Sequence, residues 1–160
     1  MSNVQDVPIV MSRNQKTGDY QFPQTHVEGV IGLEEYIENN LKEDSGWIKY
    51  SVTAPMEKDT QFTSSDYNGF TCGYRVINIL GVEKVYIRFN LRNIKSGSVV
   101  KLPNDLLSHA QSFTLRTGTA RLPVQVSIKA DGTMTFYPNA SDSGWSSTDY
   151  VYQEVNFLNN

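Results

Sequence analysis

The chain has 160 residues, enough for one domain of ordinary size with a short appendage. With 39% hydrophobic and 19% charged residues, it has the composition of a globular protein rather than of a disordered or fibrous one. Its net charge of −3 argues against a nucleic-acid partner, because such binding relies on lysines and arginines that neutralise phosphates.

The sequence also argues against membrane insertion and secretion. No stretch approaches the ~20 apolar residues that a membrane-spanning helix requires, and the first residues lack the basic start and apolar run of a secretory signal. The single cysteine, Cys72, leaves no partner for a disulfide within the chain, and we expect it to be a small buried hydrophobe. We therefore expect synthesis in a cytoplasm.

Residues 1–29 predict two short extended segments joined by a turn. An apolar run at 7–11 and an aromatic alternation at 20–23 flank a polar stretch. Pro8 and Pro23 restrict both segments to edge positions, because proline has no N–H to donate to a neighbouring strand. Since a lone hairpin is marginally stable in water, we expect this segment to lie against another surface, as a docking linker.

Residues 30–45 are predicted to contain a short α-helix that acts as an oligomerisation stem. Its apolar residues recur at helical spacing, with acidic and amide residues between them: Val30, Leu33, Ile37 and Leu41. A helix of about ten residues is too short to be stable alone, so this stripe needs a partner. The partner is either the β-rich remainder of the same chain or further copies of the stripe. We favour self-association, because the segment lies outside the strand-rich block.

Residues 46–160 are predicted to form a head that is an antiparallel β-sandwich or barrel. Apolar and polar residues alternate with the period of a strand, most clearly at 85–91, 124–128 and 150–157. An Asp-Gly pair at 131–132 is a strong signal for a two-residue hairpin. Many short strands without intervening helices indicate such a sandwich or barrel. The whole chain is therefore predicted to be mainly β.

The sequence contains no recognisable motif for catalysis, metal binding or a cofactor. His26 and His109 are the only histidines, and no zinc spacing, calcium loop, glycine-rich phosphate loop or nucleophile elbow is present. Two alternatives are a nucleophilic Cys72–His109 pair and a pair of aspartates for glycoside hydrolysis. The aspartates, however, lie in turn-like contexts where aspartate is common. We predict a non-enzymatic binding protein.

The polar loop around Trp145 is the first candidate for saccharide binding. Aromatic rings stack on the apolar faces of sugars, and planar polar groups bind the hydroxyls. Trp145 lies in the middle of this loop, with Asn139, Asp142 and Tyr150 as polar companions. The alternative is structural, with Trp145 covering the head or lying in a subunit interface.

Arg116 and Arg121 flank a flexible turn and form a second candidate region. Guanidinium groups suit the phosphate of a phosphosaccharide or a glycerol-phosphate polymer. The alternative is that both are exposed, solubilising charges. The loop at 66–70 is a third region, although its Asn-Gly pair indicates no more than a turn.

Several short segments, in order along residues 20–158, carry a family resemblance. They are Tyr-Gln-Phe-Pro-Gln-Thr-His-Val-Glu-Gly-Val-Ile-Gly-Leu at 20–33, Ser-Gly-Trp-Ile at 45–48, the strand pair at 74–77 and 85–88, the Leu-Pro turn at 100–103, and the hairpin at 120–133. Together they resemble the linker and the C-terminal heads of tail-fibre and baseplate proteins of phages, including prophages, of Gram-positive bacteria.

The resemblance implies a homotrimeric phage tail-tip protein of the virion, either a receptor-binding or an upper baseplate protein. Heads of this kind adsorb to host cell-wall polysaccharide or teichoic acid. The chain is shorter than most such fibres, so residues 1–29 would dock on other baseplate or tail proteins. Trimerisation also fits the stem, since three copies of a weak stripe bury one another and three heads multiply weak sugar contacts.

Two other functions remain open. A purely structural baseplate or fibre subunit would contact only phage proteins, and it predicts an apolar patch at the side of the head or in residues 1–29. A glycan-cleaving enzyme predicts two carboxylates that face each other in a groove. A sugar-binding head predicts exposed aromatic rings at its tip.

Overall fold

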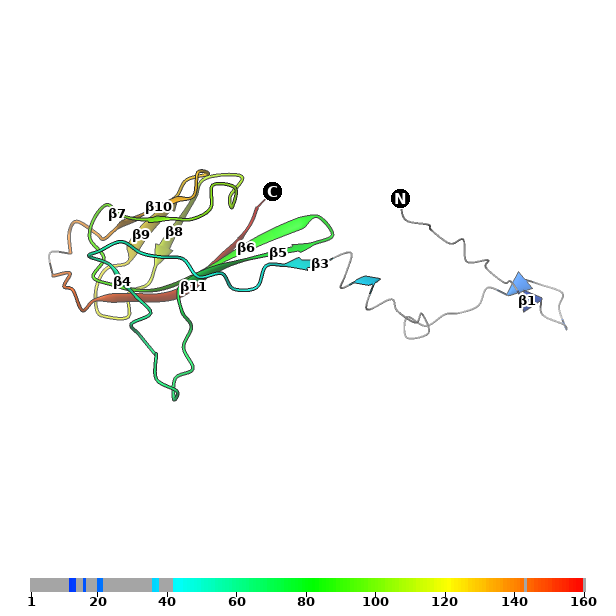
Figure 1. Cartoon of the computed structure of the whole chain (residues 1–160), viewed down its shortest axis with the longest axis horizontal. Helices are drawn as coiled ribbons and strands as arrows, with labels where there is room; N and C mark the ends of the chain where they lie inside the picture. Colours follow the sequence, from blue (N-terminus) through cyan, green and yellow to red (C-terminus); the bar gives the residue numbers. More distant parts are fainter. Residues whose placement is uncertain are drawn as a thin grey trace. The chain divides into compact units, whose positions relative to one another are not determined.

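The computed structural model describes residues 12–13, 16, 20–21, 36–37, 42–142 and 144–159. The chain divides into two compact units, residues 1–37 and 38–160. In the part that the structure describes, the chain is mainly β and its sheets are antiparallel, as predicted (Figure 1). No helix among these residues is long and apolar enough to span a membrane.

The first unit contains a small antiparallel pair of strands. Strand β1 (Ser12–Arg13) pairs with β2 (Tyr20–Gln21), with Ser12 opposite Gln21. Strand β2 falls within the extended segment predicted at 20–23, whereas β1 follows the apolar run that was predicted as the first segment. The apolar run at 7–11 lies outside the described residues.

Before residue 42, the structure describes two residues of the predicted stem, Tyr36 and Ile37. Tyr36 and Ile37 are helical, and the side chain of Ile37 is 41% exposed. The other residues of the predicted stripe lie outside the described residues: Val30, Leu33 and Leu41.

The helix predicted within the stem was expected to end at Lys42, with a break over residues 43–46, and it is wrong at that last residue. Lys42–Asp44 form strand β3, which pairs with β5 (Gly73–Ile79) from Lys42 opposite Ile79 to Asp44 opposite Ile77. The physical reason is long-range: β5 offers an open row of backbone N–H and C=O groups, which must find partners. The Asp44 carboxylate also forms an ion pair with Arg75 of β5. These contacts override the local preference for a helix.

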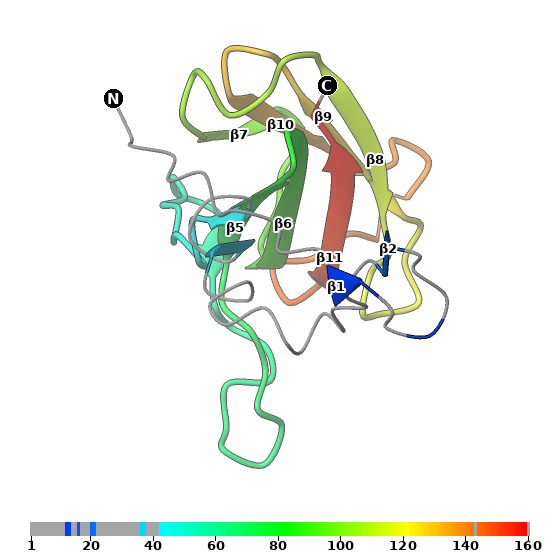
Figure 2. The ribbon, with the colours of Figure 1, turned by 90° about the vertical axis from the view of Figure 1, so that its right-hand side faces the viewer.

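The second unit, which we call the head, consists of two antiparallel sheets. One sheet has the order β11-β6-β5-β3, with β4 also paired to β6, and the other has the order β7-β10-β9-β8 (Figure 2). The remaining strands are β4 (Glu57–Lys58), β6 (Val82–Arg92), β7 (Ser98–Lys101), β8 (Gln111–Leu115), β9 (Val124–Ile128), β10 (Thr133–Tyr137) and β11 (Tyr150–Leu158).

The core lies between the facing sides of the two sheets. Every second residue of β6 is completely buried, and the same alternation in β9 and β10 supplies the other half. The fully buried side chains of these strands are Val85, Ile87, Phe89, Leu91, Val124, Val126, Ile128, Met134 and Phe136. The rings of Phe89 and Phe136 meet edge to face, with 6.1 Å between centroids, and so join the two sheets.

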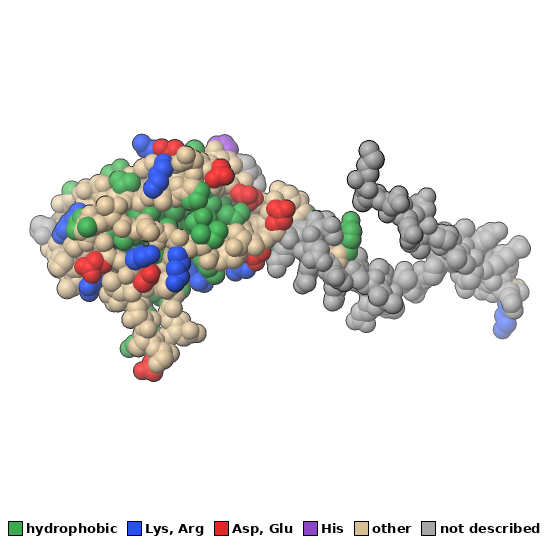
Figure 3. Space-filling model, in the orientation of Figure 1, with side chains coloured by type: hydrophobic (Ala, Val, Ile, Leu, Met, Phe, Trp, Pro, Cys, Tyr) green, Lys and Arg blue, Asp and Glu red, His purple; other side chains and the backbone are tan. Residues whose placement is uncertain are grey.

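A long loop connects β4 and β5. Residues 59–72, which we call the finger, extend away from the sheets (Figures 1 and 2). The base of the finger is bonded to β6, because the Asp59 N–H donates to the carbonyl of Asn90 at 2.8 Å. Its apolar side chains reach the surface (Figure 3). The finger therefore brings aromatic rings next to the outer side of the first sheet.

Replacing Phe89 by alanine is expected to lower the free energy of unfolding of the head by about 3–5 kcal/mol, because a buried ring is lost and a cavity is left between the sheets. Urea unfolding of the full chain measures this change. The matched control is Thr114→Ala, at an exposed position of β8, which we expect to change stability by no more than ~0.5 kcal/mol. Equal effects of the two substitutions would contradict the described core.

A candidate ligand-binding cleft

An open cleft of about 300 Å³ lies where strand β11 begins. Three segments that are distant in the sequence contribute to it: the finger, the turn after β8, and β11 itself. Its lining residues are Phe62, Arg116, Thr117, Gly118, Tyr150, Tyr152 and Gln153. Two of the residues predicted to bind ligand, Arg116 and Tyr150, therefore lie in one cleft.

One wall of the cleft is the edge of β11, onto which the turn after β8 is bonded. Thr117 and Val151 form an antiparallel bridge, and the N–H of Gly118 donates to the carbonyl of Tyr150 at 2.9 Å. The backbone N–H of Arg116 donates to Oε1 of Gln153 at 2.7 Å. A Cβ atom at position 118 would lie 2.0 Å from the Tyr150 ring, so a glycine is needed for this close approach.

The finger adds aromatic rings to this wall. Tyr152 stacks on Phe70 with 4.0 Å between centroids, and its hydroxyl accepts a hydrogen bond from the Phe70 N–H at 2.8 Å. The ring of Phe62 meets Tyr152 edge-on at 4.6 Å and lies 6.3 Å from Tyr150. Tyr67 continues the row, 5.4 Å from Phe62. The result is a cluster of rings that is partly exposed beside the cleft.

Arg116 gives the cleft a positive charge. The other arginines with described side chains each have a carboxylate partner: Arg75 with Asp44, Arg88 with Glu154, Arg92 with Glu57, and Arg121 with Asp142 and Asp149. Among the residues that the structure describes, none forms an ion pair with the exposed guanidinium of Arg116. The residues that line the cleft include no carboxylate. The site therefore favours a polar or anionic group beside the aromatic rings.

The second predicted arginine, Arg121, has a different place. Its Nε lies 3.2 Å from Oδ2 of Asp149, and its Nη1 lies 3.6 Å from Oδ1 of Asp142. Asp142 also accepts from the backbone N–H of Leu122 at 2.8 Å. We call this set of contacts the loop clamp, because it ties the loop between β10 and β11 to the turn between β8 and β9. Gly144 allows it, since a Cβ there would lie 2.1 Å from Arg121 Nη1.

The remaining predicted residues also belong to that loop rather than to the cleft lining. Trp145 packs against the core and is partly buried, and its indole Nε1 is buried without a hydrogen-bond partner in the described structure. Asn139 folds its own loop by accepting from the Ser141 N–H at 2.9 Å. This geometry favours the structural alternative for Trp145, in which its ring covers the core.

The sequence prediction did not name five of the lining residues: Phe62, Thr117, Gly118, Tyr152 and Gln153. Two signals were present. Phe62 lies in a polar loop that also holds Tyr67 and Phe70, and an aromatic residue in a polar loop is the feature that drew attention to Trp145. Tyr150 and Tyr152 share the side of β11 opposite the buried Val151, where polar residues are the usual choice. No local signal, however, could bring the finger against β11.

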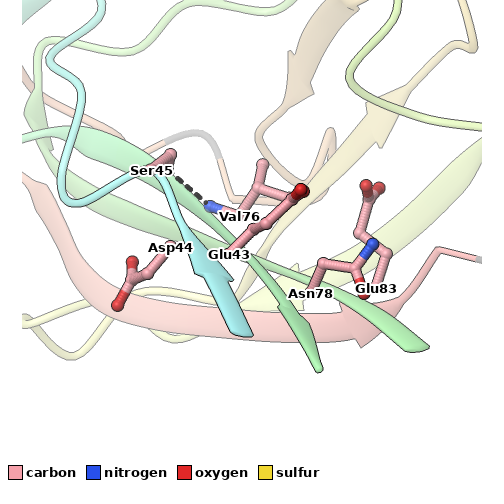
Figure 4. A pocket seen from close by; sticks show the side chains of 6 residues that line it. All are labelled: Glu43, Asp44, Ser45, Val76, Asn78 and Glu83. Atoms are coloured by element: carbon pink, nitrogen blue, oxygen red, sulfur yellow. Dashed lines mark hydrogen bonds between the residues drawn. The ribbon is translucent and has the colours of Figure 1, made fainter. Parts of the chain in front are cut away.

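A pocket of about 290 Å³ at the edge of β3 is lined by Glu43, Asp44, Ser45, Val76, Asn78 and Glu83 (Figure 4). Two of its polar groups are already used in the fold: the Ser45 hydroxyl accepts from the Val76 N–H at 2.9 Å, and the Glu83 carboxylate accepts from the Asn159 amide. No group of three or more His, Cys, Asp or Glu residues in the described ranges is arranged to hold a metal.

Cys72 is completely buried, as predicted, and its Sγ donates to the carbonyl of Asn90 at 3.2 Å. Burial raises the pKa of this thiol, so it stays protonated at neutral pH. His109, the other half of the pair considered in the sequence, is exposed. A buried, protonated thiol is poorly suited to nucleophilic attack.

Comparisons of the chain with protein-family models, with curated proteins and with solved structures find no match. Its function is therefore inferred from the cleft.

Replacing Asp149 by asparagine is expected to lower the free energy of unfolding by about 1–3 kcal/mol near neutral pH, because the carboxylate accepts from Ser146 and pairs with Arg121. Burial alone would raise the pKa of Asp149, but the Ser146 N–H, the Thr119 and Ser146 side chains and the Arg121 charge hold it below its usual value. The carboxylate thus stabilises the fold above its unfolded pKa of ~3.9, and this contribution is lost as pH falls through the lower folded pKa.

Urea unfolding of the parent and of Asp149→Asn, at neutral pH and at steps below pH ~4, tests both statements. The difference in free energy of unfolding between the parent and Asp149→Asn should become smaller as the pH falls. If this difference in free energy of unfolding is the same at every pH, the carboxylate charge of Asp149 does not stabilise the loop clamp.

Proposed function

We propose that the head binds saccharides in the cleft between the finger and β11. The observation that carries this proposal is the combination of partly exposed aromatic rings, Phe62, Tyr150 and Tyr152, with an unpaired guanidinium at the same cleft. Sugars present both kinds of surface: faces of C–H groups, which pack on rings, and hydroxyls or charged substituents, which accept from a planar cation. A purely apolar ligand would leave Arg116 without a role.

The ligand that fits best is a cell-wall saccharide, including one that carries phosphate. Arg116 offers several N–H groups in a planar fork, which matches the oxygens of a phosphate. Gln153 uses its oxygen for the backbone of Arg116, so its amide N–H groups remain to donate to a hydroxyl. Hydrolysis is not part of the proposal, because no carboxylate lines the cleft.

The wider role that we propose is that of a phage tail-tip protein. In this role, the chain is a homotrimer of the virion that adsorbs to host cell-wall polysaccharide or teichoic acid, and residues 1–29 dock on other baseplate or tail proteins. The support is the order of the matching segments in the sequence and the division into a small N-terminal unit and a β-rich head. An open cleft binds a single sugar weakly, and three heads on one stem would compensate through avidity.

Replacing Arg116 by alanine is expected to weaken binding to immobilised teichoic acid or phosphate-bearing cell-wall polysaccharide at least about tenfold, which corresponds to ~1.4 kcal/mol. The fold should be unaffected, because the side chain is exposed and Gln153 bonds to the backbone of Arg116. Lys129→Ala removes the same charge from an exposed position outside the cleft and serves as the matched control. Equal losses in the two variants would place binding elsewhere, and a parent chain that binds no polysaccharide would overturn the proposed function.

The full chain is expected to be trimeric in solution, and Ile37→Asp is expected to shift it to monomers, because a charge in the predicted apolar stripe cannot be buried without a partner. Ile37 is helical and exposed, so the substitution leaves the core of the head intact. Light scattering measures the mass, and circular dichroism checks that the head remains folded. A parent chain that is monomeric at micromolar concentration would contradict the stem.

A structural subunit is the second candidate function, and one surface favours it. The hairpin between β5 and β6 exposes apolar side chains at its tip: Ile79, Leu80 (69% exposed), Val82 and, on the neighbouring β11, Leu158. A cluster of this kind is typical of a protein contact. It is compatible with saccharide binding, because none of its residues lines the cleft. If the parent chain bound no saccharide, this surface would become the leading candidate for function.

A further inference from the structure

Phe62 has a backbone conformation that its side chain does not favour. Its φ angle is 55°, in the left-handed region, where a bulky residue is rare and an asparagine is accepted more readily. Burial does not explain the choice of phenylalanine, since 36% of its surface is exposed. The ring packs edge to face on Tyr67 and Tyr152, but this packing leaves part of it exposed at the cleft.

Gly69, on the returning arm of the finger, keeps Phe62 in this conformation. Its N–H donates to the carbonyl of Phe62 at 3.2 Å. A Cβ atom at position 69 would lie 2.4 Å from that carbonyl oxygen and 2.7 Å from the Cβ of Phe62. Since backbone atoms cannot give way as the end of a side chain can, only glycine fits here.

Asn90, in the middle of β6, fixes both arms of the finger. Its Nδ2 donates to the carbonyls of Gln61 and Phe70 at 2.9 Å each, and its Oδ1 accepts from the Gln61 N–H at 3.0 Å. The residue is 1% exposed, so these bonds replace water completely. Asn90 also lies opposite Tyr152 in the pairing of β6 with β11. These hydrogen bonds of Asn90 therefore fix the position of Phe62 relative to β11, which forms one wall of the cleft.

Strained residues that a rigid surrounding holds in place are concentrated at functional sites. We propose that Phe62 is the specificity-determining residue of the cleft, with Gly69 and Asn90 as its positioning residues, and that the ligand is a pyranose whose unsubstituted C–H face packs on the Phe62 ring. The hydroxyls of its other edge then meet Arg116. A sugar with an axial hydroxyl on the stacking face is rejected, because that oxygen would lose water against the ring. This inference rests on the proposed function and names the residue that selects among sugars.

The experiment titrates the full chain with the methyl glycosides of glucose, galactose, mannose and N-acetylglucosamine, which differ in the hydroxyls and substituents of their two faces, by ligand-observed NMR. In Phe62→Asn, the affinity for the preferred glycoside should fall about tenfold. The affinities for the four glycosides should become nearly equal, so that their ratios approach one. The midpoint of thermal unfolding should change little, because the strain that asparagine relieves offsets the lost ring contacts with Tyr67 and Tyr152. A ring with a purely structural role predicts a lower midpoint instead.

Two further variants complete the test. Gly69→Ala keeps every side chain of the cleft but displaces Phe62, so it should lose the same selectivity. Thr63→Ala changes an exposed neighbour in the finger and should lose none. If Phe62→Asn unfolds at a lower temperature and keeps the parent's ratios, the role assigned to Phe62 is wrong while saccharide binding stands. If the parent binds none of the glycosides and no cell-wall polysaccharide, both proposals fail.

Discussion

The alternation of strand β6 is the constraint on which the rest of the head depends. This strand pairs with β11, β5 and β4, so its two sides set the positions of most of the first sheet. On one side, Val85, Ile87, Phe89 and Leu91 fill the core without any exposed surface. On the other side, the amide of Asn90 is buried under the finger. A slip of one residue in register would exchange these sides, placing a polar amide in the core and leaving the finger unattached.

Charge on the surface of the head follows a simple division. Most of the described arginines are matched with a carboxylate from a neighbouring strand or loop, and exposed pairs of this kind contribute little to stability. Arg88 also makes a cation–π contact, with its guanidinium carbon 3.6 Å from the centroid of the Trp47 ring. Arg116 differs from these residues because no described carboxylate forms an ion pair with it. In a chain of net charge −3, a lone cation beside aromatic rings concentrates the attraction for an anionic or hydroxyl-rich ligand at one place.

Much of the fold could be predicted from the sequence, because it depends on local pattern. Period-two alternation identified β6, β9 and β11, and the Asp-Gly pair identified the hairpin between β9 and β10, where Gly132 has a φ of 78°. The predicted helix was wrong at Lys42, and the break predicted after it is part of strand β3, because the open edge of β5 decides the conformation of Lys42–Asp44. Two of the seven residues that line the cleft were predicted. Arg116 and Tyr150 were found, but Phe62 reaches the cleft through bonds between residues that are far apart in sequence, as in the contact of Phe70 with Tyr152.

Strand β3 has a consequence for how this head can be recombined with other proteins. It is three residues long, carries Lys42, Glu43 and Asp44, and covers the outer edge of β5. Short, charged edge strands protect a sheet against pairing with a second chain. A chimera that joins a foreign stem after Asp44 would remove this guard and present the backbone of β5, with Ile77 and Ile79, as a template for polymerisation. A recombinant head must therefore begin before Lys42 if the edge of β5 is to stay covered.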